Sequence, residues 1–169
     1  MLTKSDFLKY SQEYDKNYSN TFGSVVEAEL KKWFEKNKYL NKENFVKLGL
    51  WKSKRPKKKY EDNSEDLIEE ITRFALASDK EEVKIRSLLI LNGVSWPVAS
   101  VILHFAYPDR YPIMDFRAIW SLGWEQPKSY NFKFWQKYCD EIRRLSSEFE
   151  LSMRTIDKAL WQYSKENQK

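Results

Sequence analysis

Apolar residues recur along this chain at the three- and four-residue spacing of amphipathic helices, and strand-like alternation never lasts beyond a few residues. The clearest early stretch contains Val25, Val26, Leu30, Trp33 and Phe34. Glycine and proline are scarce, at four and five residues, and they stand between the periodic segments. The pattern therefore predicts an all-α fold.

Helices are predicted along most of the chain. Beyond the N-terminal third they lie at residues 42–50, 64–77, 135–149 and 153–163. Asn63 is a suitable N-cap for the second of these, and Ser78 with Glu81 has the form of a capping box that opens a helix ending near Leu91. At 169 residues we expect one helical domain, with the N- and C-terminal helices packed together as a second lobe.

The residues after Leu91 have the features of a tight hairpin between two helices. Gly93 suits the left-handed conformation at a helix end, Ser95 can cap the next helix, and Pro97 fits its first turn. Backbone amides at a helix N-terminus attract anions. The segment therefore predicts a phosphate site, with an ordinary αα-corner of the core as the alternative.

One carboxylate follows this hairpin. Asp115 stands between Ile113-Met114 and the helix-like run Phe116–Trp120. A carboxylate there can cap the helix, or it can stabilise positive charge on a sugar and accept a proton from water. From residue chemistry alone the cap is favoured.

These residues resemble the helix-hairpin-helix DNA glycosylase superfamily of base excision repair. The resemblance covers about residues 88–123 and depends on Leu91, Gly93, Val94, Ala99 and Asp115. It implies a two-lobed helical fold, a helix-hairpin-helix motif at about 80–107 and a catalytic role for Asp115. The runs 51–55 and 157–161 are similar to an uncharacterised bacterial branch of the superfamily.

The resemblance also predicts what this chain lacks. Pro97 stands where strand-cutting members carry a lysine, so we expect a monofunctional enzyme without lyase activity. Ser95 replaces the second glycine of the turn. The carbonyls of Leu91, Gly93 and Val94 are the implied ligands of a monovalent cation. With Cys139 as the only cysteine, no iron–sulfur cluster is expected and no cofactor is required.

Charge is concentrated in one segment, predicted to be a loop at residues 52–60. The whole chain carries a net charge of +5, and this segment holds six cations, so the remainder nets −1. Such a segment favours contact with a polyanion, although a solvated loop is the simpler interpretation. The predicted DNA-binding residues are Asn92, Gly93, Val94, Ser95, Lys52, Lys54, Arg55, Lys57, Lys58 and Lys59.

A flipped base needs flat walls, and the candidate pocket or wedge residues are Trp51, Trp96, Trp120, Trp124 and Arg117. The alternatives are core packing for most of the tryptophans and, for Arg117, phosphate binding, pairing with Asp115 or neither. His104 is interpreted as a core histidine. The carboxylates Asp109, Asp115 and Glu125 are scattered along the chain, which disfavours a metal-dependent nuclease.

The leading hypothesis is a DNA glycosylase that removes a damaged or modified base. The alternatives are a non-catalytic DNA-binding module and a helical protein–protein adaptor. We expect a monomer that binds DNA, does not enter membranes and is cytoplasmic, associated with the nucleoid if the source is bacterial. The longest apolar run, Trp96–Tyr107, is too short to span a bilayer.

Overall fold

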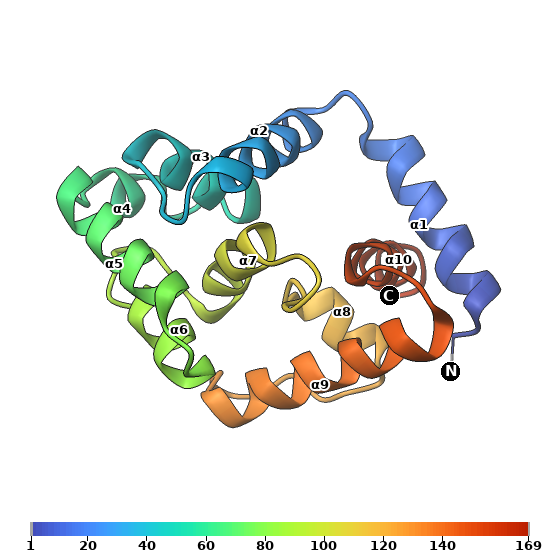
Figure 1. Ribbon diagram of the computed structural model, residues 1–169. Helices are drawn as coiled ribbons and strands as arrows, with labels where there is room; N and C mark the ends of the chain where they lie inside the picture. The colour runs from blue at the N-terminus through green and yellow to red at the C-terminus, as the bar shows by residue number, and fades with distance from the viewer. Residues whose placement is uncertain (1, 169) are drawn as a thin grey trace. The chain divides into compact units, whose positions relative to one another are not determined.

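The computed structural model describes residues 2–168, and all regular structure within them is helical, which confirms the all-α prediction (Figure 1). The helices of these residues are α1 Lys4–Tyr18, α2 Phe22–Lys36, α3 Lys42–Lys52, α4 Lys57–Glu61, α5 Glu65–Ala77, α6 Glu81–Leu88, α7 Trp96–Ala106, α8 Phe116–Ser121, α9 Phe132–Phe149 and α10 Met153–Asn167.

The chain divides into two compact units, and the first joins its two ends. This unit contains the chain up to Ser19 and from Pro108 onward. α1 lies along α10, which also packs on α8 and α9 (Figure 1). Its core is formed mainly by the apolar faces of α9 and α10, where Trp135, Ile142 and Ile156 are fully buried.

The second unit contains residues 20–107 and is built around α7. Every residue of α7 from Val98 to Ala106 is buried. α2, α3 and α6 pack against it, and α5 packs on α6. A helix that is apolar on all sides must lie in the interior, which is why α7 forms the centre of this unit.

The predicted N-cap of α5 is wrong by one residue. Ser64 is the N-cap, and its Oγ accepts a hydrogen bond from the Leu67 amide at 3.3 Å. Asn63 has a different partner, because its Oδ1 accepts a bond from the Asn92 amide at 2.8 Å. Tertiary contact therefore overrides the local preference of Asn63 for capping.

The predicted capping box before α6 is also wrong. Lys80 is the N-cap of α6, with no side-chain cap, and Ser78 Oγ accepts a bond from the Lys80 amide at 3.2 Å. α6 ends at Leu88, and the chain continues to Leu91 in a tighter turn, where the Leu91 amide bonds to the Leu88 carbonyl at 3.2 Å. The turn uses carbonyls that the helix would otherwise leave unpaired.

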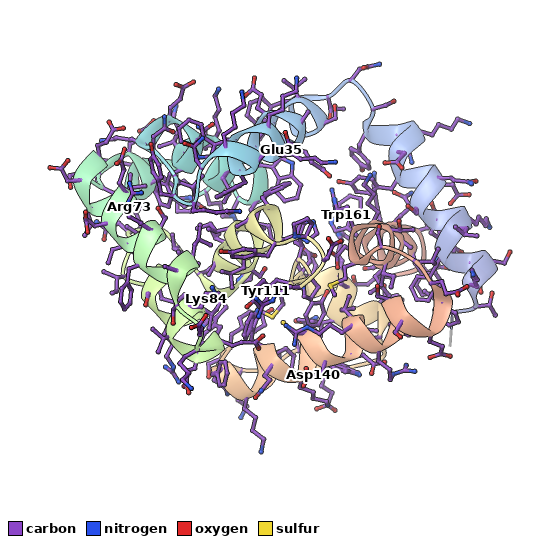
Figure 2. All side chains as sticks on the ribbon, in the orientation of Figure 1. Glu35, Arg73, Lys84, Tyr111, Asp140 and Trp161 are labelled. Carbon is purple, nitrogen blue, oxygen red and sulfur yellow. The ribbon has the colours of Figure 1, made fainter. Side chains whose placement is uncertain are left out.

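A buried lysine closes the end of α5. Lys84 is 3% exposed, and its Nζ donates to the Leu76 carbonyl at 2.8 Å (Figure 2). The Tyr107 hydroxyl donates to the same carbonyl at 2.9 Å, and Lys84 Nζ lies 5.0 Å from the Tyr107 ring centroid. These contacts bind α5, α6 and the end of α7 into one unit.

Gly49 in α3 allows the buried ring of Tyr60 to approach the helix backbone. A Cβ at Gly49 would lie 2.7 Å from two carbons of this ring, which is fully buried and has no space to move. Gly23 in α2 differs, because a Cβ there would meet its nearest atom, Thr21 Oγ1, at 3.5 Å.

This contrast predicts opposite effects of the same substitution. Gly49→Ala should lower the free energy of unfolding by about 1–3 kcal/mol, because overpacking exceeds the gain in helix propensity. Gly23→Ala should be neutral or stabilising by up to about 1 kcal/mol. Urea unfolding followed by circular dichroism measures both. Equal stabilisation by the two substitutions would show that Tyr60 does not constrain α3.

Candidate functional site

The residues predicted to form the site divide between the two units. The hairpin residues and the basic segment lie in the second unit, whereas Asp115, Arg117 and Trp120 lie in the first.

The turn between α6 and α7, residues 89–95, adopts the conformation predicted at its glycine. Gly93 has φ +85°, in the left-handed region that glycine enters without strain. The Val94 amide donates to the Leu91 carbonyl at 3.1 Å, which closes the turn. α7 then begins at Trp96, with Pro97 in its first turn.

Not every amide of this turn is available for an anion. The Asn92 and Val94 amides are used within the protein, by Asn63 Oδ1 and by the Leu91 carbonyl. Within residues 2–168 the amides of Gly93, Ser95 and Trp96 have no hydrogen-bond acceptor. Ser95 is the N-cap residue of α7, as predicted, but its side chain does not make the expected capping hydrogen bond.

The basic segment is not the continuous loop that was predicted. Lys52 ends α3, and the three consecutive lysines form most of the short helix α4, which follows Pro56. Lys57 forms an ion pair with Glu61 at 3.7 Å. The exposed cations for which no carboxylate partner exists between residues 2 and 168 are Lys54, Arg55, Lys58 and Lys59.

Tyr60 anchors this segment to the α6–α7 turn. Its ring lies between the two glycines Gly49 and Gly93, since a Cβ on either would come within 2.7 Å of it. A Cβ on Gly93 would also lie 3.2 Å from Lys59 Cβ. Lys59 is therefore in direct contact with the turn that holds the unpaired amides.

Asn63 provides the polar part of the same connection. Its Nδ2 donates to the carbonyls of Lys59 and Asn92, at 2.9 and 3.1 Å, while its Oδ1 accepts the Asn92 amide. One amide side chain thus joins the end of the basic segment to the turn. The two predicted DNA-binding features form one surface of the second unit, although neither Tyr60 nor Asn63 was among the predicted site residues.

Of the two tryptophans predicted in this unit, Trp51 has a packing role. Its Nε1 donates to the Gly23 carbonyl at 3.0 Å, and its ring meets Phe105 edge to face at 5.5 Å. Trp96 is half-buried at the start of α7, with the Arg86 guanidinium 6.0 Å from its ring centroid. Trp96 is therefore the better candidate for a contact beside the turn.

In the first unit, a buried segment of chain leads to Asp115. Tyr111 is fully buried and stacks on Trp135 at 5.9 Å (Figure 2). The Ile113 amide donates to Asp157 Oδ2 at 2.9 Å, and the Tyr138 hydroxyl donates to the Ile113 carbonyl at 3.0 Å. Both polar groups of the Ile113 backbone are therefore bound by buried side chains, from α9 and α10.

Asp115 is half-buried and is the N-cap of α8. Its Oδ1 accepts a hydrogen bond from the Arg117 amide at 2.9 Å. The capping role favoured by residue chemistry is thus confirmed. The cap fixes one oxygen of the carboxylate at the start of α8.

The surroundings of Asp115 include two tyrosines. Burial, and then the negative charge of Asp115, raise the pKa of Tyr130 above its ordinary value. Burial, and next the charge of Asp157, raise the pKa of Tyr138 well above the ordinary range. Both hydroxyls therefore stay protonated and can act only as neutral hydrogen-bonding groups near the carboxylate.

The residue that follows Asp115, Phe116, is an exposed aromatic side chain. Phe116 is 51% exposed, and the Arg117 guanidinium lies 5.2 Å from its ring centroid. Trp120 is half-buried and its ring lies 6.0 Å from that of Tyr163, while Trp124 has Lys137 Nζ 4.2 Å from its centroid. Phe116 and Trp120 are thus the candidate stacking residues of the first unit.

Residues 2–168 contain no group of three or more histidine, cysteine or acidic side chains that could hold a metal ion. His104 is 3% exposed and lies against Phe105, and Cys139 is buried. From residue 2 to residue 168 no helix has the length and apolar character needed to cross a bilayer.

No protein-family model matches the chain, and neither the curated proteins nor the solved structures contain a significantly similar one. The site is therefore interpreted from its own residues.

Two buried tyrosines offer a matched test of the connections described above. Tyr60 and Tyr138 are both fully buried, but the Tyr60 hydroxyl has no hydrogen-bond partner whereas that of Tyr138 donates to Ile113. Tyr60→Phe should raise the free energy of unfolding by about 1 kcal/mol, and Tyr138→Phe should lower it by about 1–2 kcal/mol. Urea unfolding near pH 7 decides the signs. Destabilisation by both substitutions would mean that the Tyr60 hydroxyl is bonded in solution.

The raised pKa of Tyr60 predicts how the free energy of unfolding changes in alkaline solution. Burial raises the pKa of Tyr60 to about 12. An unfolded tyrosine loses its proton near pH 10, so the unfolded state binds fewer protons between about pH 10 and 12, and stability falls as pH rises. The advantage of Tyr60→Phe over wild type should therefore grow across this window. Unfolding measured in parallel on both proteins checks this, and a constant difference would contradict it.

Proposed function

We propose that this protein is a monofunctional DNA N-glycosylase that removes a damaged or modified base. The observation that carries the proposal is the attachment of Asp115. Its half-buried carboxylate follows a backbone segment whose polar groups are bound by Tyr138 and Asp157, and it lies beside the exposed ring of Phe116. Catalytic groups require such fixed positioning.

Cleavage of an N-glycosidic bond develops positive charge on the sugar. In the proposed mechanism Asp115 stabilises this charge and accepts a proton from the attacking water. The free base leaves, and an abasic site remains in an intact strand. Pro97 has no amine with which to form a Schiff base, which supports base removal without strand scission.

The surface formed by the basic segment and the α6–α7 turn supports DNA as the partner. Its exposed cations and the unpaired amides of Gly93 and Ser95 are suited to backbone phosphates. The carbonyls of Leu91, Gly93 and Val94 are the proposed ligands of a monovalent cation, and oxygen donors suit such an ion.

A second candidate function is a non-catalytic DNA-binding module. The bond from the Arg117 amide to Asp115 favours it, because capping alone gives this carboxylate a structural role. Both candidates predict salt-dependent DNA binding, and they differ in whether an abasic product forms.

The substitution Asp115→Asn separates the two roles of this residue. Asparagine caps helices about as well as aspartate, so folding and DNA affinity should be nearly unchanged. Excision should fall by at least about a hundredfold, because the negative charge is lost. The assay incubates duplexes carrying different lesions with the protein and then cleaves abasic sites by heat or alkali.

The matched control is Asp109→Asn, which removes the same charge from an exposed position in the same unit. It should retain full excision. Equal excision by wild type and Asp115→Asn would exclude the proposed catalytic role. Tight DNA binding without product from any lesion would support the non-catalytic module.

A further inference from the structure

α10 carries a cluster of aromatic residues and cations that the proposed function does not use. Trp161 lies on α10 (Figure 2), and its ring contacts residues of α1. Its ring meets those of Tyr14 and Tyr18 edge to face, at 5.5 and 5.3 Å with interplanar angles of 87°. All three residues are partly exposed, so the cluster lies at the surface of the first unit.

Two cations lie against the Trp161 ring. The Arg117 guanidinium is 5.5 Å from its centroid, and Lys165 Nζ is 5.6 Å from the same point. Lys165 also donates a hydrogen bond to the Tyr18 hydroxyl and lies 5.0 Å from the Tyr18 ring centroid. We call Trp161, Tyr18, Arg117 and Lys165 the α10 patch.

The cations of the α10 patch are not neutralised by acidic side chains. Neither Arg117 nor Lys165 forms an ion pair with a carboxylate of residues 2–168. Lys158 on the same helix differs, because its Nζ pairs with Asp15 at 2.7 Å. The patch therefore presents two positive charges beside one indole ring, held in place by contacts with aromatic faces.

This chemistry favours one class of partner. Partly exposed aromatic rings beside cations are the features by which proteins bind single-stranded nucleic acid, since the rings contact bases and the cations contact phosphates. Arg117 also connects the patch to the candidate catalytic residue, because its amide donates to Asp115 Oδ1 at 2.9 Å. A strand that passes Asp115 thus comes close to the patch.

We propose that the α10 patch binds a nucleic-acid strand, with Arg117 and Lys165 contacting phosphates and Trp161 and Tyr18 contacting a base. The proposal rests on the proposed function in taking nucleic acid as the partner, but it requires no catalysis. It gives the first unit its own contact with the strand, separate from the basic segment of the second.

The test uses the full chain and a fluorescein-labelled single-stranded DNA, with binding followed by anisotropy over a series of salt concentrations. The double variant Arg117→Gln/Lys165→Gln is compared with Lys128→Gln/Lys133→Gln, which removes the same charge from exposed positions in the same unit. The slope of log K against log salt should decrease by about 1.4 in the first variant only, since each phosphate contact on a single strand contributes about 0.7.

Trp161 is tested separately, because its ring also packs between helices. Trp161→Leu should weaken binding about tenfold or more, and Trp161→Phe should restore most of the affinity, since a stacking face is retained. Circular dichroism of both variants shows whether the helices are intact. Equal affinities of the Leu and Phe variants would argue against base stacking.

The outcomes distinguish this inference from the proposed function. A smaller slope of log K against log salt for Arg117→Gln/Lys165→Gln, with the slope of the control variant unchanged, supports nucleic-acid binding by the α10 patch. This holds even if no lesion yields an abasic product. Equal slopes of the two double variants overturn the patch, while excision by wild type would leave the glycosylase proposal intact. Tighter binding of polyglutamate than of DNA would also overturn the patch, in favour of an acidic protein partner.

Discussion

A buried backbone amide or carbonyl without a partner costs about 1–3 kcal/mol, and this constraint decides how the helices of this protein are joined. Inside a helix the constraint is met automatically, but at each connection a side chain must supply the missing partner. Side chains from distant parts of the chain do so at the backbone of Leu40, Leu76, Asn92 and Ile113. Two of these four positions adjoin candidate functional residues. Asn92 lies in the α6–α7 turn, and Ile113 lies two residues before Asp115.

The bond at Asn92 has a consequence for the basic segment. α4 has five residues, too few for an isolated helix to be stable, and its consecutive lysines repel one another. Tyr60 and Asn63 supply the tertiary contacts that hold it against the α6–α7 turn. A segment whose backbone is already ordered loses less conformational entropy on binding than a mobile loop. The segment is therefore better prepared to bind a polyanion than its sequence alone indicates.

The all-α fold, most helix positions and the conformation of Gly93 were predictable, because periodicity and turn chemistry are local properties. The roles of Asn63 and Tyr60 were not. Asn63 has a strong local preference for capping, but its actual partner, Asn92, lies 29 positions away in the sequence. Tyr60 follows three consecutive lysines, yet it is fully buried. Long-range contacts of this kind leave no periodic signal.

Tyr138 and Asp157 left a weaker signal that could have been used. Each is a polar residue on the apolar face of its helix, Tyr138 near Ile142 and Asp157 near Leu160. A polar group in such a position must find a buried partner, which indicates an attachment point for another segment. The sequence does not specify which segment these side chains bind. In the structure they bind the backbone of Ile113, in the segment that leads to Asp115.

The capping bond of Asp115 is compatible with catalysis. The bond from the Arg117 amide holds one carboxylate oxygen in place at the start of α8. A carboxylate that stabilises a sugar cation must be fixed in position. A cap at this place is therefore a reason to test for catalysis.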